Sequence, residues 1–203
     1  MTGGHIGTVM VTGANRGIGL ELIRQLAEMP NPPERIFATC RDPQDKRMQE
    51  MKKLAAKHPS IVILKLEATD EESIKAAAKE VEAHLAGKGL NLLINNAGVM
   101  PPSTLESVTQ EDMLNVCKIN LVGPMLVTKT ALNMLTRCQA LEYKDDGILF
   151  AAIHPGWVKT DMGTEKAELM VEESVHGILN VLSNLSEEHS GRFLNWEGKF
   201  VAW

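Results

Sequence analysis

Three glycines in one short stretch, Thr12-Gly13-Ala14-Asn15-Arg16-Gly17-Ile18-Gly19, have the spacing of a phosphate-binding turn. The first glycine allows a tight turn, the second lets the backbone approach a pyrophosphate, and the third lets a helix pack closely on a strand. An apolar run at 8–11 precedes the stretch and a helical pattern at 20–27 follows it. The N–H groups at the start of such a helix would hold phosphates. We therefore predict a dinucleotide site, with an ordinary turn as the alternative. Its residues are Gly13, Asn15, Arg16, Gly17, Ile18 and Gly19.

A second candidate binding residue, Arg41, stands directly after the apolar run 35–40. This is about the place where a dinucleotide site meets the adenosine ribose. No carboxylate ends this run, although an NAD site would use one to bind the ribose hydroxyls. The planar, charged guanidinium of Arg41 suits a 2'-phosphate, and Arg16 is a second cation within reach. We therefore predict NADP rather than NAD. The alternative is that both arginines are solvated surface charges.

A third motif, Asn95-Asn96-Ala97-Gly98, follows the apolar run 91–94. Small residues at the end of a strand allow a cofactor to lie against the backbone. We predict that Asn96, Ala97 and Gly98 contact the cofactor, although this motif alone could be an ordinary turn.

The elements that must position these motifs alternate between strands and helices. Predicted strands cover 8–11, 35–40, 60–66 and 91–94, and predicted helices cover 17–29, 46–58 and 71–86. This alternation predicts an α/β fold, a doubly wound parallel sheet with helices on both faces. No repeat, low-complexity tract or proline-rich linker interrupts residues 1–203, so we predict one domain.

Composition excludes several classes of function. The net charge of -5, with acidic and basic residues interspersed, argues against nucleic acid and anionic membranes as partners. No apolar run has the length of a membrane span. The three cysteines and six histidines lack metal-ligand spacing, so we predict no metal. The odd number of cysteines in apolar surroundings indicates reduced thiols and a cytoplasmic protein.

The glycine-rich turn and the NNAG motif together resemble the short-chain dehydrogenase/reductase family, whose first turn reads TGxxxGxG. The resemblance covers nearly the whole chain. Lys118-Ile119-Asn120 is similar to the sequence around the family's active-site asparagine, and residues 155–162, PGWVKTDM, are similar to its nicotinamide loop. The resemblance implies a catalytic role for Asn120. It also implies cofactor contacts from Pro155, Gly156, Val158 and Thr160.

The C-terminal sequence 191–196, GRFLNW, and the closing Trp203 resemble the sniffer-type, C-factor-like carbonyl reductases of this family. The resemblance implies a Rossmann-type fold, NADPH as the cofactor and a small carbonyl compound as the substrate. Glu67 follows the third strand where relatives place an aspartate that contacts adenine. Glu67 either replaces that aspartate or is a solvated acid.

The family's chemistry needs a tyrosine that transfers the hydroxyl proton and a serine that holds the substrate oxygen. It also needs a lysine, four residues after the tyrosine, that lowers the tyrosine pKa. Lys129, in the sequence TKTALN, matches this lysine, but Met125 stands four residues before it. Tyr143, the sole tyrosine, does not match the motif. No serine-bearing strand lies between Asn120 and Lys129. The resemblance therefore implies that the serine/tyrosine segment is missing and that the sheet is one strand short.

The remaining predicted elements are a long helix, a strand, a shorter helix and a final strand at 193–195. Residues 110–144 predict a nearly uninterrupted helix, kinked only at Pro124. In an ideal helix, Asn120 and Lys129 would lie half a turn apart in azimuth and about 13 Å apart along the axis. They would then share no water molecule, and a surface ammonium is the alternative role for Lys129. The next strand, 148–153, either leaves a gap in the sheet or slides to pair with the fourth strand, which is the less costly solution. A helix is predicted at 165–184.

The apolar residues of the long helix lie on all its sides, so both of its faces need cover. We predict a homodimer through this helix, with an aggregation-prone surface as the alternative. The leading functional hypothesis is an NADP(H)-dependent oxidoreductase of the short-chain carbonyl-reductase type. It should be weak or inactive without the tyrosine and serine. The alternative is a non-catalytic nucleotide-binding or interaction protein, such as a shortened form that pairs with an intact relative.

Overall fold

The structure is a computed structural model that describes residues 6–101, 104, 106–131 and 145–201. The described residues form two compact units, 6–131 and 145–201, here called the N-terminal and C-terminal units. The expectation of one domain therefore stays a prediction.

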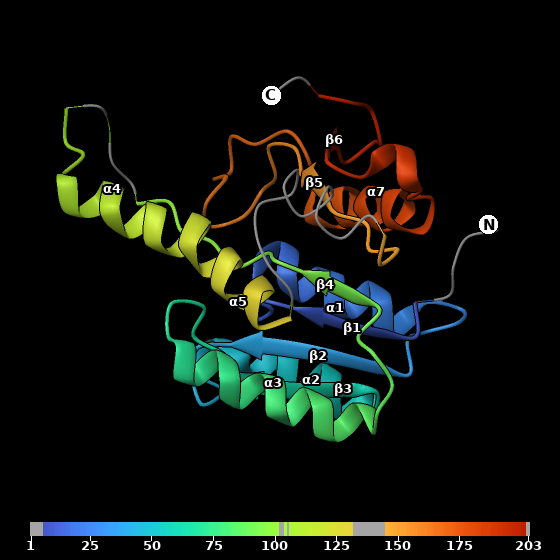
Figure 1. Cartoon of the computed structure of the whole chain (residues 1–203). Coiled ribbons are helices and arrows are strands. Elements are labelled where there is room, and N and C mark those ends of the chain that lie inside the picture. The colour runs from blue at the N-terminus through green and yellow to red at the C-terminus, as the bar shows by residue number, and fades with distance from the viewer. Residues whose placement is uncertain (1–5, 102–103, 105, 132–144, 202–203) are drawn as a thin grey trace. The chain divides into compact units, whose positions relative to one another are not determined.

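A four-stranded parallel sheet forms the centre of the N-terminal unit (Figure 1). Its strands are β1 Thr8–Val11, β2 Arg35–Cys40, β3 Ile61–Lys65 and β4 Leu92–Ile94, in the order β3-β2-β1-β4. In register, Val11 pairs with Ala38 on one side and with Ile94 on the other. This arrangement confirms the α/β fold class. It also agrees with the expectation of a sheet shorter than that of the resembled family.

Helices cover both faces of this sheet. They are α1 Gly17–Glu28, α2 Gln49–Lys57 after a short 3-10 turn Lys46–Met48, and α3 Glu71–Leu85. Met10 and Phe37 point from the sheet into one core cluster with residues of α3. Their equally buried neighbours Val9 and Ile36 lie outside this cluster, because successive strand residues face opposite sides. On that second face α1 contacts β1 and β2.

A continuous helical stretch ends the N-terminal unit. It consists of α4 Gln110–Cys117, a π-helical turn Lys118–Val122 and α5 Gly123–Ala131. Thr109 and Asp112 form a capping box at its start. The predicted helix is confirmed up to Ala131, and the rest of it, with Tyr143, lies outside the described residues. The π turn widens the helix, so the ideal-helix angle between Asn120 and Lys129 does not apply.

The C-terminal unit contains β5 Ala151–His154, α7 Val171–Ser183, a 3-10 turn Glu187–His189 and β6 Arg192–Asn195. β5 and β6 pair in parallel, with His154 opposite Asn195. Val175 of α7 and Leu194 of β6 are fully buried. The two alternatives for the place of β5 beside the first sheet stay predictions.

The predicted helix 165–184 is wrong at its start, because α7 begins only at Val171. The preceding residues form turns, followed by an isolated bridge in which Leu169 pairs with Val158. Two backbone bonds hold it, from Lys159 N to Leu169 O (2.9 Å) and from Leu169 N to Trp157 O (3.2 Å). Residues 165–168 form a turn and a bend in place of the predicted helix, and the N–H of Ala167 donates to Thr164 O at 3.3 Å.

Candidate functional site

The glycine-rich turn joins β1 to α1 with the geometry that its sequence predicts. Gly13 and Gly17 have φ values of 64° and 50°, which favour glycine. A Cβ atom on Gly13 would lie 2.8 Å from Ala97 Cα. A Cβ atom on Gly19 would overlap the Gly13 carbonyl oxygen and lie 2.6 Å from Asn96 Nδ2. The turn and the start of α1 therefore pack backbone against backbone.

The start of α1 suits an anion. Arg16 precedes the helix in an extended conformation, with a φ of -163°. The first turn contains Gly17, Ile18 and Gly19 and no acidic residue. Its backbone N–H groups need acceptors that the helix itself does not supply, and phosphate oxygens are acceptors of the right charge. Asn15, half-buried, and Arg16, exposed, border this position.

Thr12 fastens the glycine-rich turn to the NNAG motif. Its side chain is only 2% exposed, and its hydroxyl accepts hydrogen bonds from the N–H groups of Asn96 and Ala97, both at 3.0 Å. In return, Asn96 Nδ2 donates to the carbonyl oxygens of Thr12 (2.9 Å) and Gly13 (3.2 Å). Asn96 thus holds the turn, a structural role that the motif alone did not reveal. Thr12 was missed as a site residue, although a polar residue that ends an apolar strand was a usable signal.

The carboxyl ends of parallel strands lie at one edge of a sheet, so the register brings the predicted cofactor residues to one edge of the N-terminal unit. Arg41 follows β2 there and is exposed. Its neighbour Cys40 is buried, and this burial raises the pKa of the thiol, as does the nearby Asp42 carboxylate. Cys40 is therefore a packing residue, whereas Arg41 is directed to a polar ligand or to solvent.

Glu67 is engaged with its own loop. One carboxylate oxygen accepts from the N–H (3.2 Å) and the hydroxyl (3.1 Å) of Thr69, and the Glu67 N–H donates to Ser73 Oγ (2.9 Å). The carboxylate therefore shapes the loop after β3. Neither of the two predicted roles, an adenine contact or a solvated acid, included this local bond.

Asn120 lies in the π turn and clamps the loop after the NNAG motif. Its Oδ1 accepts from Val99 N–H, and its Nδ2 donates to Val99 O, both at 2.8 Å. Gly98 lies beside the same amide, because a Cβ there would be 3.6 Å from Asn120 Oδ1. Lys129 lies in α5, and its side chain lies outside the described part. The catalytic roles of Asn120 and Lys129 stay predictions.

The residues predicted for the nicotinamide lie in the C-terminal unit, directly after β5. Gly156 has a φ of 85°, and Val158 is 4% exposed. Thr160 Oγ1 accepts from Gly163 N–H (3.1 Å). The Pro155 carbonyl accepts from the hydroxyl of Ser174 (2.6 Å), a fully buried residue of α7. This segment, 155–160, is thus held by α7 and by the pairing of Val158 with Leu169.

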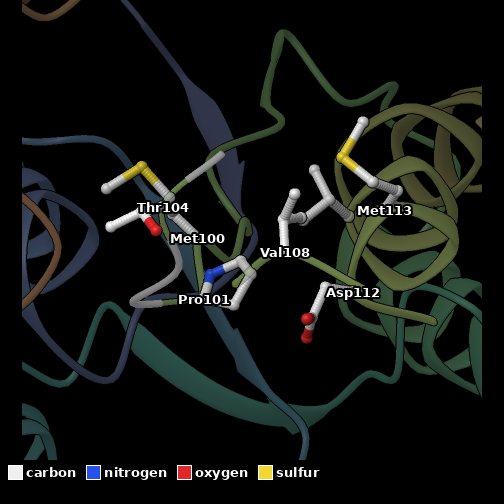
Figure 2. A pocket seen from close by; sticks show the side chains of 7 residues that line it. Met100, Pro101, Thr104, Val108, Asp112 and Met113 are labelled. Carbon is white, nitrogen blue, oxygen red and sulfur yellow. The ribbon is translucent and has the colours of Figure 1, made fainter. Parts of the chain in front are cut away.

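A hollow of about 340 Å³ lies in the N-terminal unit between the loop after NNAG and α4 (Figure 2). The described residues that line it are mostly apolar: Met100, Pro101, Thr104, Val108, Asp112, Met113 and Val116. Hydrogen bonds from the hydroxyl and then the N–H of Thr109 hold the pKa of Asp112 below its usual range. This carboxylate caps the start of α4, so a ligand in the hollow would meet mainly apolar side chains.

Metal-ligand clusters and membrane-spanning helices are absent from the part of the chain that the structure describes. No group of His, Cys, Asp or Glu there could hold a metal ion. No helix there combines the length and the apolar character needed to cross a bilayer.

Comparison with known proteins gives two matches to family profiles. The profile described as short chain dehydrogenase matches residues 7–133, and the profile described as Enoyl-(Acyl carrier protein) reductase matches residues 123–180. Among solved structures, the NADPH-bound carbonyl reductase from chicken fatty liver is 45% identical. It covers 98% of this chain and 100% of its own, with a TM-score of 0.93.

The carbonyl reductase Sniffer of Drosophila melanogaster is 28% identical, with a TM-score of 0.92 and coverage of 98% of this chain and 100% of its own. An uncharacterized oxidoreductase of Schizosaccharomyces pombe is 25% identical over 248 aligned positions, which cover 94% of this chain and 96% of the yeast protein. Because this chain has only 203 residues, the alignment must contain gaps in this chain where the yeast protein has residues.

Proposed function

Since the chain belongs to the short chain dehydrogenase family, we propose that it binds NADP(H) at the carboxyl edge of its four-stranded sheet. The observation that carries this proposal is the turn between β1 and α1, where a Cβ on Gly13 or Gly19 would meet backbone or Asn96. In this proposal the start of α1 binds the pyrophosphate and Arg41 binds the 2'-phosphate. The chicken relative is itself an NADPH-bound protein.

The segment 155–160 would hold the nicotinamide half of the cofactor. Bound NADPH would supply a hydride to the carbon of a small carbonyl compound. The residues of this segment would orient the cofactor and the carbonyl compound. Gly156 gives the chain a sharp turn, and the buried Val158 and Ser174 fix that turn to the body of the C-terminal unit. The chain is thus proposed to be a carbonyl-reductase type of oxidoreductase, as two of its structural relatives are by name.

Weak or absent turnover is part of this proposal. Met125, where the family motif has tyrosine, has no proton to donate. The 248 aligned positions against a chain of 203 residues support a missing internal segment. Asn120 binds Val99 with both ends of its amide, and an amide N–H is too weak an acid to replace the tyrosine as proton donor.

The choice of NADP over NAD is tested by replacing Arg41 with alanine. Loss of a charge-assisted bond at an exposed position should weaken NADPH binding about tenfold and leave NADH binding nearly unchanged. Titration of the fluorescence of each dinucleotide with wild type and variant measures both affinities. Arg47, whose guanidinium binds Asp45 Oδ2 at 2.7 Å, provides the control Arg47→Ala. Equal losses for NADPH and NADH, or no loss, would contradict the role of Arg41.

Exposed apolar side chains on the stretch 110–122 favour a homodimer, the second part of the proposal. Met113, Leu114, Leu121 and Val122 are 56%, 61%, 48% and 40% exposed. The same surface supports the alternative function, a non-catalytic nucleotide-binding protein that pairs with an intact relative. The free thiols of Cys40 and Cys117 fit a cytoplasmic location, which we also propose.

Replacing Leu114 with glutamate tests the dimer. An unpaired charge in an apolar interface should raise the dissociation constant of the dimer by about 30-fold, which corresponds to about 2 kcal/mol. Sedimentation equilibrium measures the constant. Asn115→Glu, which places the same charge on the next exposed residue, is the matched control. A wild-type chain that sediments as a monomer, or as heterogeneous aggregates, would refute the homodimer.

A further inference from the structure

His154 connects β5 to the proposed nicotinamide segment, and its imidazole is bonded to that segment. The N–H of Gly156 donates to Nδ1 of His154 at 2.9 Å. The ring also packs edge-on against Phe193, with 6.3 Å between ring centroids and 65° between ring planes. Because Nδ1 accepts a hydrogen bond, the neutral imidazole carries its proton on Nε2. The side chain is exposed, so this N–H is directed away from Gly156 and toward a ligand or solvent.

Three other side-chain donors in or beside the segment bond to its own backbone or to the adjoining turn. Trp157 Nε1 donates to Gly163 O at 2.8 Å, and Thr160 Oγ1 donates to Val158 O at 3.4 Å. Ser174 Oγ donates to Pro155 O at 2.6 Å. These bonds maintain the loop, and breaking one to bind substrate would leave a carbonyl without its partner. The Nε2–H of His154 is a donor that a substrate could engage without breaking any of these bonds.

We propose that His154, as a neutral imidazole, donates a hydrogen bond from Nε2 to the oxygen of the carbonyl substrate. This inference rests on the proposed function, because it places the substrate over a nicotinamide held by 155–160. The imidazole is tied to Gly156 within that segment, so its place relative to the segment is set inside the C-terminal unit alone. His154 would thus take over the task of holding the substrate oxygen that the missing serine has in the resembled family.

The proposed step conserves atoms and charge. Hydride addition to the carbonyl carbon moves the electron pair of the C=O π bond onto oxygen. Nε2–H stabilises this oxygen by its hydrogen bond and keeps its own proton, as a neutral imidazole donor can. A water molecule then protonates the oxygen and leaves hydroxide to the buffer. The ring polarises the carbonyl but supplies no proton, which is consistent with slow turnover.

Infrared spectroscopy of a bound ketone tests this contact without relying on turnover. The probe is acetophenone labelled with ¹³C at the carbonyl, bound to the protein in the presence of NADP⁺. In the wild-type protein the C=O stretch should shift to lower wavenumber than in water-free solvent. His154→Phe, which keeps an aromatic ring beside Phe193 but has no donor, should lose the shift, and His154→Gln, which keeps an N–H donor, should restore most of it. His176→Phe, at an exposed histidine of α7, is the matched control.

Kinetics and nitrogen NMR complete the test. His154→Phe should reduce kcat for ketone reduction about tenfold, which is less than the effect of losing a donor in a closed site, because this donor is exposed. The Kd of NADPH is measured beside kcat, because the variant also loses the acceptor of the Gly156 N–H. Nitrogen-15 NMR of the wild-type protein should show the proton of His154 on Nε2. A C=O frequency that is the same in wild type and His154→Phe, or a proton on Nδ1, overturns the proposal. Failure of the wild-type protein to bind NADPH would instead refute the proposed function, and the role of His154 with it.

Discussion

Replacing Gly19 with valine is expected to weaken NADPH binding about 100-fold. The Cβ atom of any other residue would overlap the Gly13 carbonyl oxygen and lie 2.6 Å from Asn96 Nδ2. Neither neighbouring atom can move without a loss of stability. The Gly13 oxygen belongs to the backbone of the turn, and Asn96 Nδ2 donates to the carbonyls of Thr12 and Gly13. The start of α1 must therefore move away from the turn, and the N–H groups proposed to bind the pyrophosphate move with it.

Titration of NADPH fluorescence measures this effect, and circular dichroism shows whether the variant is folded. Gly89→Val is the matched control, because a Cβ there would meet no atom within 4 Å. Gly19→Ala should give an intermediate loss, since it adds only the first carbon. Unchanged NADPH affinity in a folded Gly19→Val protein would mean that the cofactor does not use this turn.

Reduction of carbonyl compounds is expected to run about 10² to 10⁴ slower than in an intact family member, because a positioned general acid supplies about that factor. Met125 stands four residues before Lys129, where the resembled motif has its tyrosine, and the donor proposed to replace the serine is an exposed imidazole that keeps its proton. Protonation of the substrate oxygen then depends on water. Hydride transfer remains feasible in this account, but the product oxygen receives its proton slowly.

Much of the fold could be predicted from the sequence, because the strands are continuous apolar runs between clear turn signals. β1 and β2 have the predicted bounds, 8–11 and 35–40. The start of α7 could not be predicted, because a turn at 165–166 and the pairing of Leu169 with Val158 replace a helical pattern that looks regular in the sequence. The π turn at Lys118–Val122 likewise leaves no local signal in the sequence.

The candidate site was predictable where a motif imposes backbone geometry and not where contacts are long-range. The positive φ angles of Gly13 and Gly17 follow from the glycine pattern. The bonds of Thr12 to residues 84 and 85 positions away, and the grip of Asn120 on Val99, depend on the strand order and could not be read from spacing. The orientation of His154 depends on a turn two residues later, which a glycine at 156 suggests but does not fix.

The most direct measurement compares cofactor binding with turnover in one preparation. NADPH is first titrated by fluorescence, and loss of nicotinamide absorbance is then followed with ketones, aldehydes and quinones, with the chicken carbonyl reductase assayed beside it. The account predicts NADPH affinity within about tenfold of the chicken enzyme, with kcat about 10² to 10⁴ lower. A kcat equal to that of the chicken enzyme would contradict the account, because a residue outside the family's motif would then have to supply the proton.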